Sequence, residues 1–247
     1  MSTNKIYERV ADVIGECPDH KSYKTLLDIG AGPGHLIDLL EAKFGFTASA
    51  VDYTDTLMKR AGQKVDIVDL NKEGLPYPDN SFDVVTLTEV IEHLEFNREV
   101  LREVSRVIKP GGLVVVTTPN ILNLNSRLRF LWFGFWNLFG PLPVKHGELY
   151  STGGHINPIS VFYIGHGLMD ADFDAVSVTV DKYQRSSIAK LILLWLPIKF
   201  FAALIWRKEV KRYKTINADN APLVREMNTV PMLLGRTVVV SARKPRA

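Results

Sequence analysis

The stretch LLDIGAGPGHLIDLL, from Leu26 to Leu40, decides the fold of this chain. It joins an apolar, β-rich run to a run with helical spacing, and three glycines stand at every second position between them. A strand, a glycine turn and a helix N-terminus direct free backbone N–H groups toward a ligand that glycine allows to approach closely. The spacing is G-x-G-x-G, and His35 stands where the dinucleotide fingerprint has its last glycine, so a nucleotide-like ligand other than NAD is expected.

Strand and helix patterns alternate on both sides of this stretch. The spacing predicts strands over 25–29, 47–51, 65–68, 82–87, 113–118, 175–180 and 236–242, and helices over 35–44, 56–61 and 95–108. This rhythm is typical of βαβ units. It predicts an α/β, Rossmann-like, doubly wound fold: a mostly parallel seven-stranded sheet with helices on both faces and an antiparallel last strand.

Length and composition favour one elaborated domain over 1–247. The polar, amphipathic N-terminus predicts a helical cover over 1–22 and no secretory signal. A net charge of +3 argues against nonspecific nucleic-acid binding as the main task. The single cysteine, Cys17, excludes an internal disulfide, and a reducing cytoplasm is the simplest compartment. The oligomeric state is left open.

Two insertions, 121–157 and 185–235, fall outside the strand and helix rhythm. The first places six aromatic residues between Phe130 and Phe139, and the second contains a nearly continuous apolar run, 188–206, followed by five basic residues and one acid. Lys190, Lys199 and Pro197 weaken a membrane span, so two short helices or a re-entrant hairpin are expected there. The two insertions are interpreted as lids or as membrane-facing segments, with peripheral membrane contact through 127–139 and 188–214, and extra core or a dimer interface is the alternative.

Four motifs in order carry a family resemblance: LLDIGAGPGHLIDLL, AVDYTD, DNSFDVVTLTEVIEHL and REVSRVIKPGGLVVVTTPN. From about Tyr23 to Asn120, the chain resembles a class I S-adenosylmethionine-dependent methyltransferase of the small-molecule type. The resemblance implies that S-adenosylmethionine is the cofactor. It also implies that Asp28 lies near the methionine amino group, and that Gly30, Ala31 and Gly32 pack against the methionine and ribose portion.

Acidic residues at two further strand ends complete the expected cofactor site. Asp52 ends the second predicted strand at the carboxyl edge of the sheet, where a carboxylate can accept both ribose hydroxyls, with Tyr53 beside it. Asp69 resembles the adenine-contacting acid of the family, and Leu70 supplies a backbone N–H beside the ring. A helix N-cap or turn acid is the alternative for Asp52, and a strand-end turn residue is the alternative for Asp69.

Three residues are predicted to border the reacting centre. Thr88 and Glu89 match the loop beside the methionine sulfonium, so both are expected to line the methyl-transfer cavity. His93 is either a base near the acceptor or a histidine that orders the loop, and since Glu92 and His93 are adjacent, only one of them is expected to point into the site. His155 in GELYSTGGHINPIS resembles a histidine that precedes an acceptor-lining helix, which makes it a second candidate for the base; His146, Glu148 and Tyr150 share that segment.

No metal site is predicted, because no fixed ligand spacing such as H-E-x-x-H is present. The predicted function is O-methylation of a small-molecule, lipid-like or lipid-linked sugar acceptor, in the cytoplasm or at the inner face of a membrane. C- or N-methylation of a lipid or quinone-type acceptor is one alternative, and a non-catalytic, cofactor-binding membrane-associated protein is another. The acceptor itself is not predicted by any motif.

Overall fold

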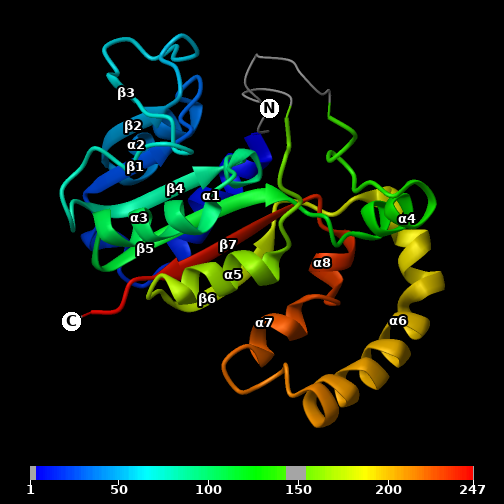
Figure 1. The fold of residues 1–247 in the computed structure, drawn as a ribbon. Coiled ribbons are helices and arrows are strands. Elements are labelled where there is room, and N and C mark those ends of the chain that lie inside the picture. The colour runs from blue at the N-terminus through cyan, green and yellow to red at the C-terminus, as the bar shows by residue number, and fades with distance from the viewer. Residues whose placement is uncertain (1–3, 143–153, 247) are drawn as a thin grey trace.

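The computed structural model describes residues 4–142 and 154–246. Its elements lie around one mixed sheet (Figure 1). The strands are β1 (Thr25–Ile29), β2 (Thr47–Asp52), β3 (Val65–Ile67), β4 (Phe82–Thr88), β5 (Ile108–Pro119), β6 (Asp174–Val180) and β7 (Thr237–Arg243). The α-helices are α1 (Asn4–Glu16), α2 (His35–Phe44), α3 (Asn97–Val107), α4 (Leu124–Phe133), α5 (Val161–Asp170), α6 (Ile188–Lys208), α7 (Ala221–Glu226) and α8 (Val230–Leu234). Short turns of helix are η1 (His20–Ser22), η2 (Ile91–His93), η3 (Arg185–Ser187) and η4 (Glu209–Tyr213).

The strand order is β3-β2-β1-β4-β5-β7-β6, and β7 runs antiparallel to both β5 and β6. The remaining pairs, from β3 to β5, are parallel. The predicted mostly parallel, seven-stranded sheet with an antiparallel last strand is therefore confirmed. The chain reverses its direction of winding between β1 and β4, and ligands in open α/β sheets bind at such a point, beyond the carboxyl ends of the strands.

Alternating side chains divide the core into two layers, one on each face of the sheet. Leu27 and Val85 pack with α3 and α5 on one face, while Leu26 and Val84 pack with α1 and α2 on the other. This follows from the strand period of two. Because both faces are covered, parallel strands such as β4 and β5 consist of nearly continuous buried residues.

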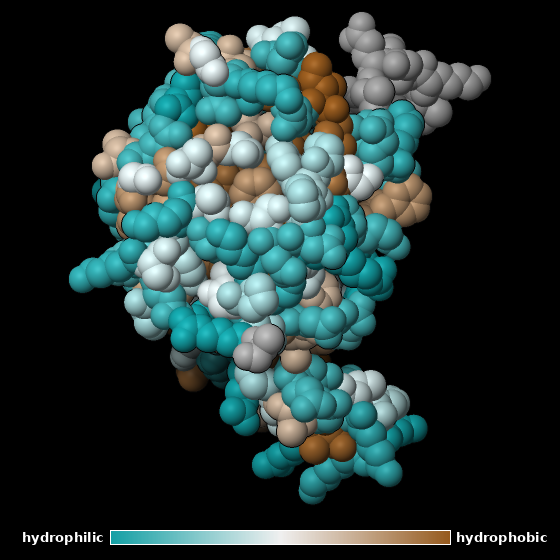
Figure 2. Space-filling view, turned by 90° about the vertical axis from the view of Figure 1, so that its left-hand side faces the viewer, coloured by the Kyte–Doolittle hydropathy of each residue, from teal (hydrophilic) through white to brown (hydrophobic). Residues whose placement is uncertain are grey.

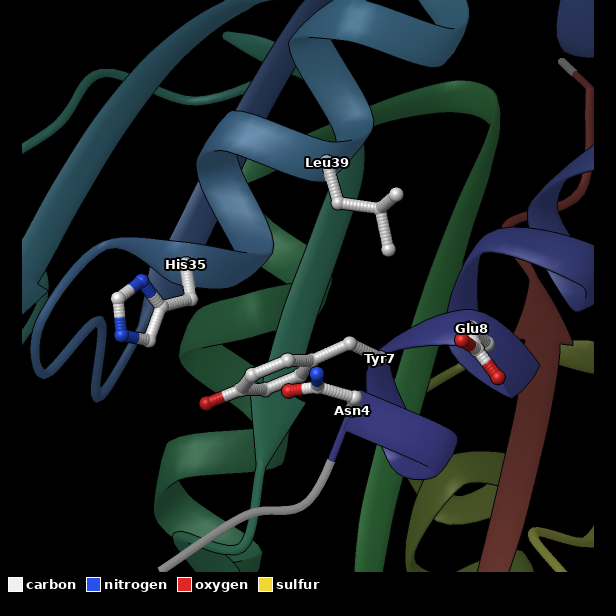
Figure 3. Close-up of a pocket in the computed structure, with 5 residues that line it drawn as sticks. All are labelled: Asn4, Tyr7, Glu8, His35 and Leu39. Atoms are coloured by element: carbon white, nitrogen blue, oxygen red, sulfur yellow. The ribbon is translucent and has the colours of Figure 1, made fainter.

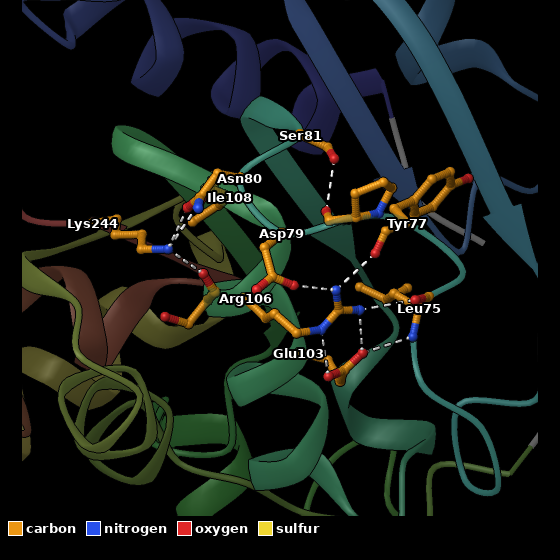
Figure 4. Close-up of polar contacts among 11 residues, drawn as sticks. Leu75, Tyr77, Asp79, Asn80, Ser81, Glu103, Arg106, Ile108 and Lys244 are labelled. Carbon is orange, nitrogen blue, oxygen red and sulfur yellow. Dashed lines mark hydrogen bonds and ion pairs between the residues drawn. The ribbon is translucent and has the colours of Figure 1, made fainter.

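Helix α1, within the predicted N-terminal cover, buries Ile6, Val10 and Ile14 at helical spacing. Helix α3 likewise buries Val100, Leu101 and Val104. Its Arg106 donates to the backbone oxygens of Leu75 and Tyr77 and pairs with Asp79 and Glu103 (Figure 4). These contacts fix the polar loop between β3 and β4 to the body, so this loop is ordered although it contains no strand or helix.

Two secondary-structure predictions are wrong. Residues 56–61 form turns rather than a helix, because Gly62 follows at once and the segment buries too little apolar surface to stabilise a helix. The run 188–206 is neither two short helices nor a hairpin, since α6 continues through Pro197. Proline removes one hydrogen bond from a helix, and the strong helix formers around it carry the helix past that position.

Helix α6 projects from the body, and the chain returns to the sheet through α7 and α8 (Figure 1). By length and composition alone, α6 could cross a membrane. The most apolar window within Arg185–Tyr213 has a mean hydropathy of 2.1, and 0% of that window is buried inside the protein. Ile192, Leu193 and Leu196 are each at least 75% exposed. In Figure 2, the face of the body near β3 is mainly hydrophilic, and a narrower part of the molecule extends below it. The apolar excess of the composition is thus partly located in α6.

Candidate active site

The carboxyl ends of β1, β2 and β4 bring the predicted cofactor residues to one edge of the sheet. The register pairs Ile29 with Val51 and with Leu87, so the residues that follow these three lie side by side. They are Gly30, Asp52 and Thr88. Residues far apart in the sequence therefore meet where the winding reverses.

The glycine loop has the backbone that the sequence pattern demands. Gly30 and Gly32 have positive φ angles of 73° and 50°, which L side chains rarely adopt. A Cβ at Gly30 would stand 2.2 Å from Cγ2 of Val90, whereas a Cβ at Gly32 would meet nothing within 4 Å. Gly30 is therefore required by packing, and Gly32 leaves open space where a ligand can approach the backbone.

Asp52, the last residue of β2, stabilises this loop through hydrogen bonds. Its Oδ2 accepts from the backbone N–H of Gly32 at 2.8 Å, and its Oδ1 accepts from the N–H of Tyr53 at 2.8 Å. Burial raises the pKa of the carboxyl group, and these hydrogen bonds partly oppose the rise. Each carboxylate oxygen retains a lone pair for a further donor.

Asp28 lies beneath the loop on β1 and is 2% exposed. It accepts a hydrogen bond of 2.7 Å from the hydroxyl of Thr86, and burial together with the nearby Asp52 raises its pKa to about 7. An isolated buried carboxylate is costly in this environment. A cationic ligand group in the loop would offset that cost, which agrees with the expected position of an amino group.

The residues predicted at the adenine end lie farther out. Asp69 accepts from the N–H of Asn71 and pairs with Lys72 at 2.6 Å, and this pairing lowers its pKa. The alternative of a turn acid therefore accounts for its observed contacts. Leu70 lines a pocket of about 220 Å³ between the loop after β3 and α3. Tyr53 is 45% exposed.

A larger pocket of about 410 Å³ lies between α1 and the first turns of α2, lined by Asn4, Tyr7, Glu8, His35 and Leu39. In Figure 3 the ring of Tyr7 extends toward the side on which His35 stands. His35 directly follows the glycine loop, so the N-terminal helix contributes a wall close to this loop. The predicted carboxylates Asp28 and Asp52 lie at the sheet edge and are not among the residues that line this pocket.

Thr88 ends β4 and Glu89 follows it, with its backbone N–H still bonded to the oxygen of Thr117 in β5 at 3.2 Å. Glu89 has a positive φ of 57°, and its Oε1 accepts from the hydroxyl of Thr117 at 3.3 Å. Strained backbone of this kind persists where surrounding contacts hold it, and it gathers at functional sites. Burial raises the pKa of Glu89 to about 7, in the range suited to proton transfer near neutral pH.

Glu92, His93 and His155 form one cluster, with one ligand-type atom from each lying within 4.8 Å of the others. The rings of His93 and His155 meet edge to face at a centroid distance of 4.8 Å. Glu92 and His93, of which only one was expected to point into the methyl-transfer site, both contribute to this cluster. Both lie on a single 3₁₀ turn, η2, and the third member approaches from another segment, so a shared helix face is not needed.

Burial perturbs two members of the cluster in opposite directions. It raises the pKa of Glu92 well above its ordinary value, and the nearby Glu89 carboxylate raises it further. Burial lowers the pKa of His155, as does the neighbouring His93. A neutral imidazole with a lone pair is the form in which histidine accepts a proton or binds a metal.

Asn120 directly follows β5 and has a structural role. It is 4% exposed and donates to the backbone oxygens of Met232 and Gly235, which ties β5 to the segment before β7. His146, Glu148 and Tyr150 lie outside the described residues.

Comparison with known proteins agrees with this geometry. Residues 3–178 match the profile of a family described as a methyltransferase domain. The chain belongs to this family. Its Rossmann-like fold is the one that the resemblance implied, and a solved SAM-dependent methyltransferase shares this fold. The family and the fold of the prediction are therefore confirmed.

Two relatives in sequence are named as enzymes of ubiquinone/menaquinone biosynthesis. The chain is 29% identical over 149 residues to the ubiquinone/menaquinone biosynthesis C-methyltransferase UbiE of an Enterobacter species, covering 55% of this chain and 59% of that enzyme. It is 30% identical over 112 residues to the UbiE protein of Salmonella arizonae, covering 41% and 45% of the two chains. The chain thus spans less than two thirds of the curated relatives that it matches.

Solved structures share the fold at low sequence identity. A SAM-dependent methyltransferase from Archaeoglobus fulgidus superposes with a TM-score of 0.61 and 18% identity, over 98% of this chain and 95% of that one. Phosphoethanolamine N-methyltransferase 2 of Haemonchus contortus, solved in complex with S-adenosyl-L-methionine, gives a TM-score of 0.52 and 15% identity, over 95% and 53%. These similarities show the architecture and leave the acceptor undetermined.

Proposed function

We propose that this methyltransferase transfers the methyl group to a hydroxyl oxygen of a small-molecule, lipid-like or lipid-linked sugar acceptor. The observation that carries the proposal is the cluster of Glu92, His93 and His155 beside Glu89, one turn beyond the strand end that adjoins the glycine loop. A hydroxyl must lose its proton when it is methylated, and the cluster supplies carboxylate and imidazole groups for that proton.

The cofactor residues in this proposal are Asp28, Gly30, Ala31, Gly32, Asp52, Tyr53, Asp69, Leu70, Thr88 and Glu89. Bound S-adenosylmethionine supplies an electrophilic methyl group. Asp28 attracts the amino group, Asp52 accepts from the ribose hydroxyls while it holds Gly32 in place, and Glu89 borders the methyl-transfer cavity. Because the electrophile is already reactive, positioning of the two reactants provides much of the rate.

Glu89, His93 and His155 are the candidates for the catalytic residues. His155 combines a lowered pKa with a buried Nδ1 that has no hydrogen-bond partner, so this nitrogen can receive a proton. The Nδ1 of His93 lies 3.0 Å from the backbone oxygen of Gly154, and this contact orients its ring. His155 is therefore our first candidate for the general base, and His93 holds the segment that carries it.

C-methylation of a quinone-type acceptor is a second candidate, because the curated relatives are named C-methyltransferases. The two candidates differ in the atom that receives the methyl group. Incubation with isotopically labelled S-adenosylmethionine and a cell extract, fractionated into lipid, sugar and small molecules, isolates the product. NMR of the labelled methyl group then distinguishes an O-methyl from a C-methyl product, and a C-methyl product would overturn the oxygen proposal.

We also propose that the protein acts on the cytoplasmic side of a membrane, with peripheral contact through 127–139 and 188–214. Trp132 is 79% exposed on α4, and Ile192 and Leu193 are 78% and 76% exposed on α6. Aromatic and aliphatic side chains of this kind favour the headgroup boundary, and the basic residues after α6 favour anionic lipid. Such contact suits an acceptor with a lipid portion.

A further inference from the structure

The cluster formed by Glu92, His93 and His155 has features that proton transfer alone does not require. Glu92 is 0% exposed, and its Oε1 has no hydrogen-bond partner, while its Oε2 accepts from the hydroxyl of Thr118 at 3.0 Å. Across residues 4–142 and 154–246, neither Glu89 nor Glu92 forms an ion pair with lysine or arginine. A buried carboxylate in native structure is normally paired or coordinates a metal.

Each histidine of the cluster is held in the way that metal-binding histidines are held. A ring whose second nitrogen donates to a backbone oxygen has a fixed tautomer and orientation, and its other nitrogen carries the lone pair. In His93, Nδ1 faces the oxygen of Gly154. In His155, the backbone of Leu138 provides the hydrogen-bond partner, and the buried Nδ1 has none.

The segment that carries His155 is fixed to the turn that carries the other two residues. The backbone N–H of Asn157 donates to the backbone oxygen of Glu92 at 3.0 Å. The side-chain amide of Asn157 donates to the backbone oxygen of Leu94 at 3.2 Å. Phe139 also packs against the ring of His155, with a centroid distance of 5.2 Å. The two segments that carry the three side chains are therefore held together before any ligand arrives, and only side-chain rotation is needed to bring the ligand atoms closer.

We propose that Glu92, His93 and His155 bind one divalent metal ion of the class that imidazole and carboxylate select together, Mn²⁺, Fe²⁺ or Zn²⁺. Two imidazoles and one carboxylate leave coordination positions open, which is the pattern of a catalytic rather than a structural site. Ligand atoms around such an ion lie about 3.4 Å apart, so the present separations within 4.8 Å close by about 1 Å through side-chain rotation.

The role of the ion rests on the proposed O-methylation, although its binding does not. With the ion bound, Nδ1 of His155 is a metal ligand, so it is not the base in this form of the enzyme. An acceptor hydroxyl that coordinates the ion loses its proton to water instead, because a metal ion stabilises the resulting oxyanion. The oxygen then forms a bond to the methyl carbon while the carbon–sulfur bond breaks, and its electron pair returns to sulfur. The products are a methyl ether, S-adenosylhomocysteine and one proton.

The first test is calorimetric titration of the chelator-treated full chain with Mn²⁺, Zn²⁺ and Mg²⁺, together with metal analysis of the undialysed protein. One equivalent of Mn²⁺ or Zn²⁺ is expected, bound more tightly than Mg²⁺. Glu92→Gln and His155→Ala are each expected to weaken binding at least tenfold. His166→Ala removes an exposed histidine of α5 and serves as the matched control for adventitious surface binding, so its affinity should equal that of the wild type.

A spectroscopic readout separates metal binding from structural effects. Electron paramagnetic resonance of the Mn²⁺ complex should show coupling to imidazole nitrogen, and this coupling should decrease in His155→Gln. Cofactor affinity and thermal unfolding in each variant report whether the fold is retained. If a folded wild-type chain binds none of the metals, or if Glu92→Gln and His155→Gln bind Mn²⁺ like the wild type, the metal site is overturned.

The metal proposal and the proposed function fail in different ways. Metal binding at these residues without O-methyl product leaves the site standing and overturns the proposed reaction. O-methyl product that forms at an unchanged rate after chelation, from a protein without bound metal, overturns the metal site and leaves the proposed reaction standing.

Discussion

The glycine-loop edge and helix α6 lie at opposite extremes of burial in the same chain. Asp28 and Asp52 are 2% and 7% exposed, although both are acidic, whereas Ile192 and Leu193 are 78% and 76% exposed, although both are apolar. Each region reverses the usual preference of its residues, and such reversals are the informative ones. The proposed cofactor, with its donors and positive charge, would account for the buried acids, and the proposed membrane contact would account for the exposed apolar residues.

The largest expected effect comes from removing the acid that joins the loop to the cofactor. In Asp52→Ala, cofactor affinity should fall about 100-fold or more, since hydrogen bonds to a charged group contribute about 1.5–3 kcal/mol each. Calorimetric titration with S-adenosylmethionine and with its demethylated product measures the loss. Asp55→Ala, at an exposed position on the same loop, is the control and should bind like the wild type. A folded Asp52→Ala variant with wild-type affinity would contradict the proposed ribose contact.

The ionisation of Asp28 predicts how cofactor affinity depends on pH. Because its pKa in the folded protein is about 7, the carboxyl is largely neutral below neutral pH, and an amino group binds the ionised form better. Affinity for the cofactor should therefore increase about tenfold between pH 6 and pH 8. Calorimetry in buffers of different ionisation heat should also detect proton release near pH 6.

The stability of the ligand-free protein should respond to Asp28 in the opposite sense. A raised pKa in the folded state means that the folded chain binds the proton more tightly than the unfolded chain does, so the unfolding free energy decreases as the pH rises from 4 to 7. Asp28→Asn, which cannot ionise, should remove the pH dependence of cofactor affinity and reduce that of stability. Glu89, Glu92 and Asp52 also contribute to the pH dependence of stability through their raised pKa values. A pH profile that is unchanged in Asp28→Asn would assign the titration to another group.

The sequence predicted the loop edge better than the outer segments for a physical reason. The positions of Gly30, Gly32 and Asp52 follow from the local order of strand, glycine turn and helix, which any parallel sheet brings to its carboxyl edge. The resemblance added the cofactor identity. The turns over 56–61 could not be distinguished from a short helix by spacing, because tertiary burial, which they lack, decides such short segments.

The cluster proposed to border the acceptor was harder to predict, because its residues are distant in the sequence. His155 lies 62 positions beyond His93. No fixed spacing marks the cluster, so a metal site was not expected from the sequence. The continuity of α6 through Pro197 was missed for a different reason: proline disfavours a helix, and only the whole segment shows that the surrounding residues outweigh it.

A pair of glycines offers a more modest test of the loop. Gly32→Ala and Gly45→Ala both add a Cβ in open space at positive φ, so each should lower the unfolding free energy by about 1 kcal/mol. Only Gly32→Ala should also weaken cofactor binding, because its Cβ occupies the space where the ligand meets the backbone. Thermal unfolding and calorimetry measure the two effects, and equal cofactor affinity in both variants would show that the ligand lies elsewhere.

The smallest expected effect on the fold comes from α6. The triple variant Ile192→Ser, Leu193→Ser, Leu196→Ser changes side chains that are at least 75% exposed, so the unfolding free energy should stay within about 0.5 kcal/mol of wild type. Sedimentation with anionic vesicles should nevertheless decrease strongly, since those side chains are the proposed contact. A matched variant with Lys5→Ser and Lys64→Ser, exposed residues far from α6, should sediment like the wild type. If the folded wild-type chain does not sediment with such vesicles, the apolar face of α6 does not bind membranes and the proposed lipid contact is wrong.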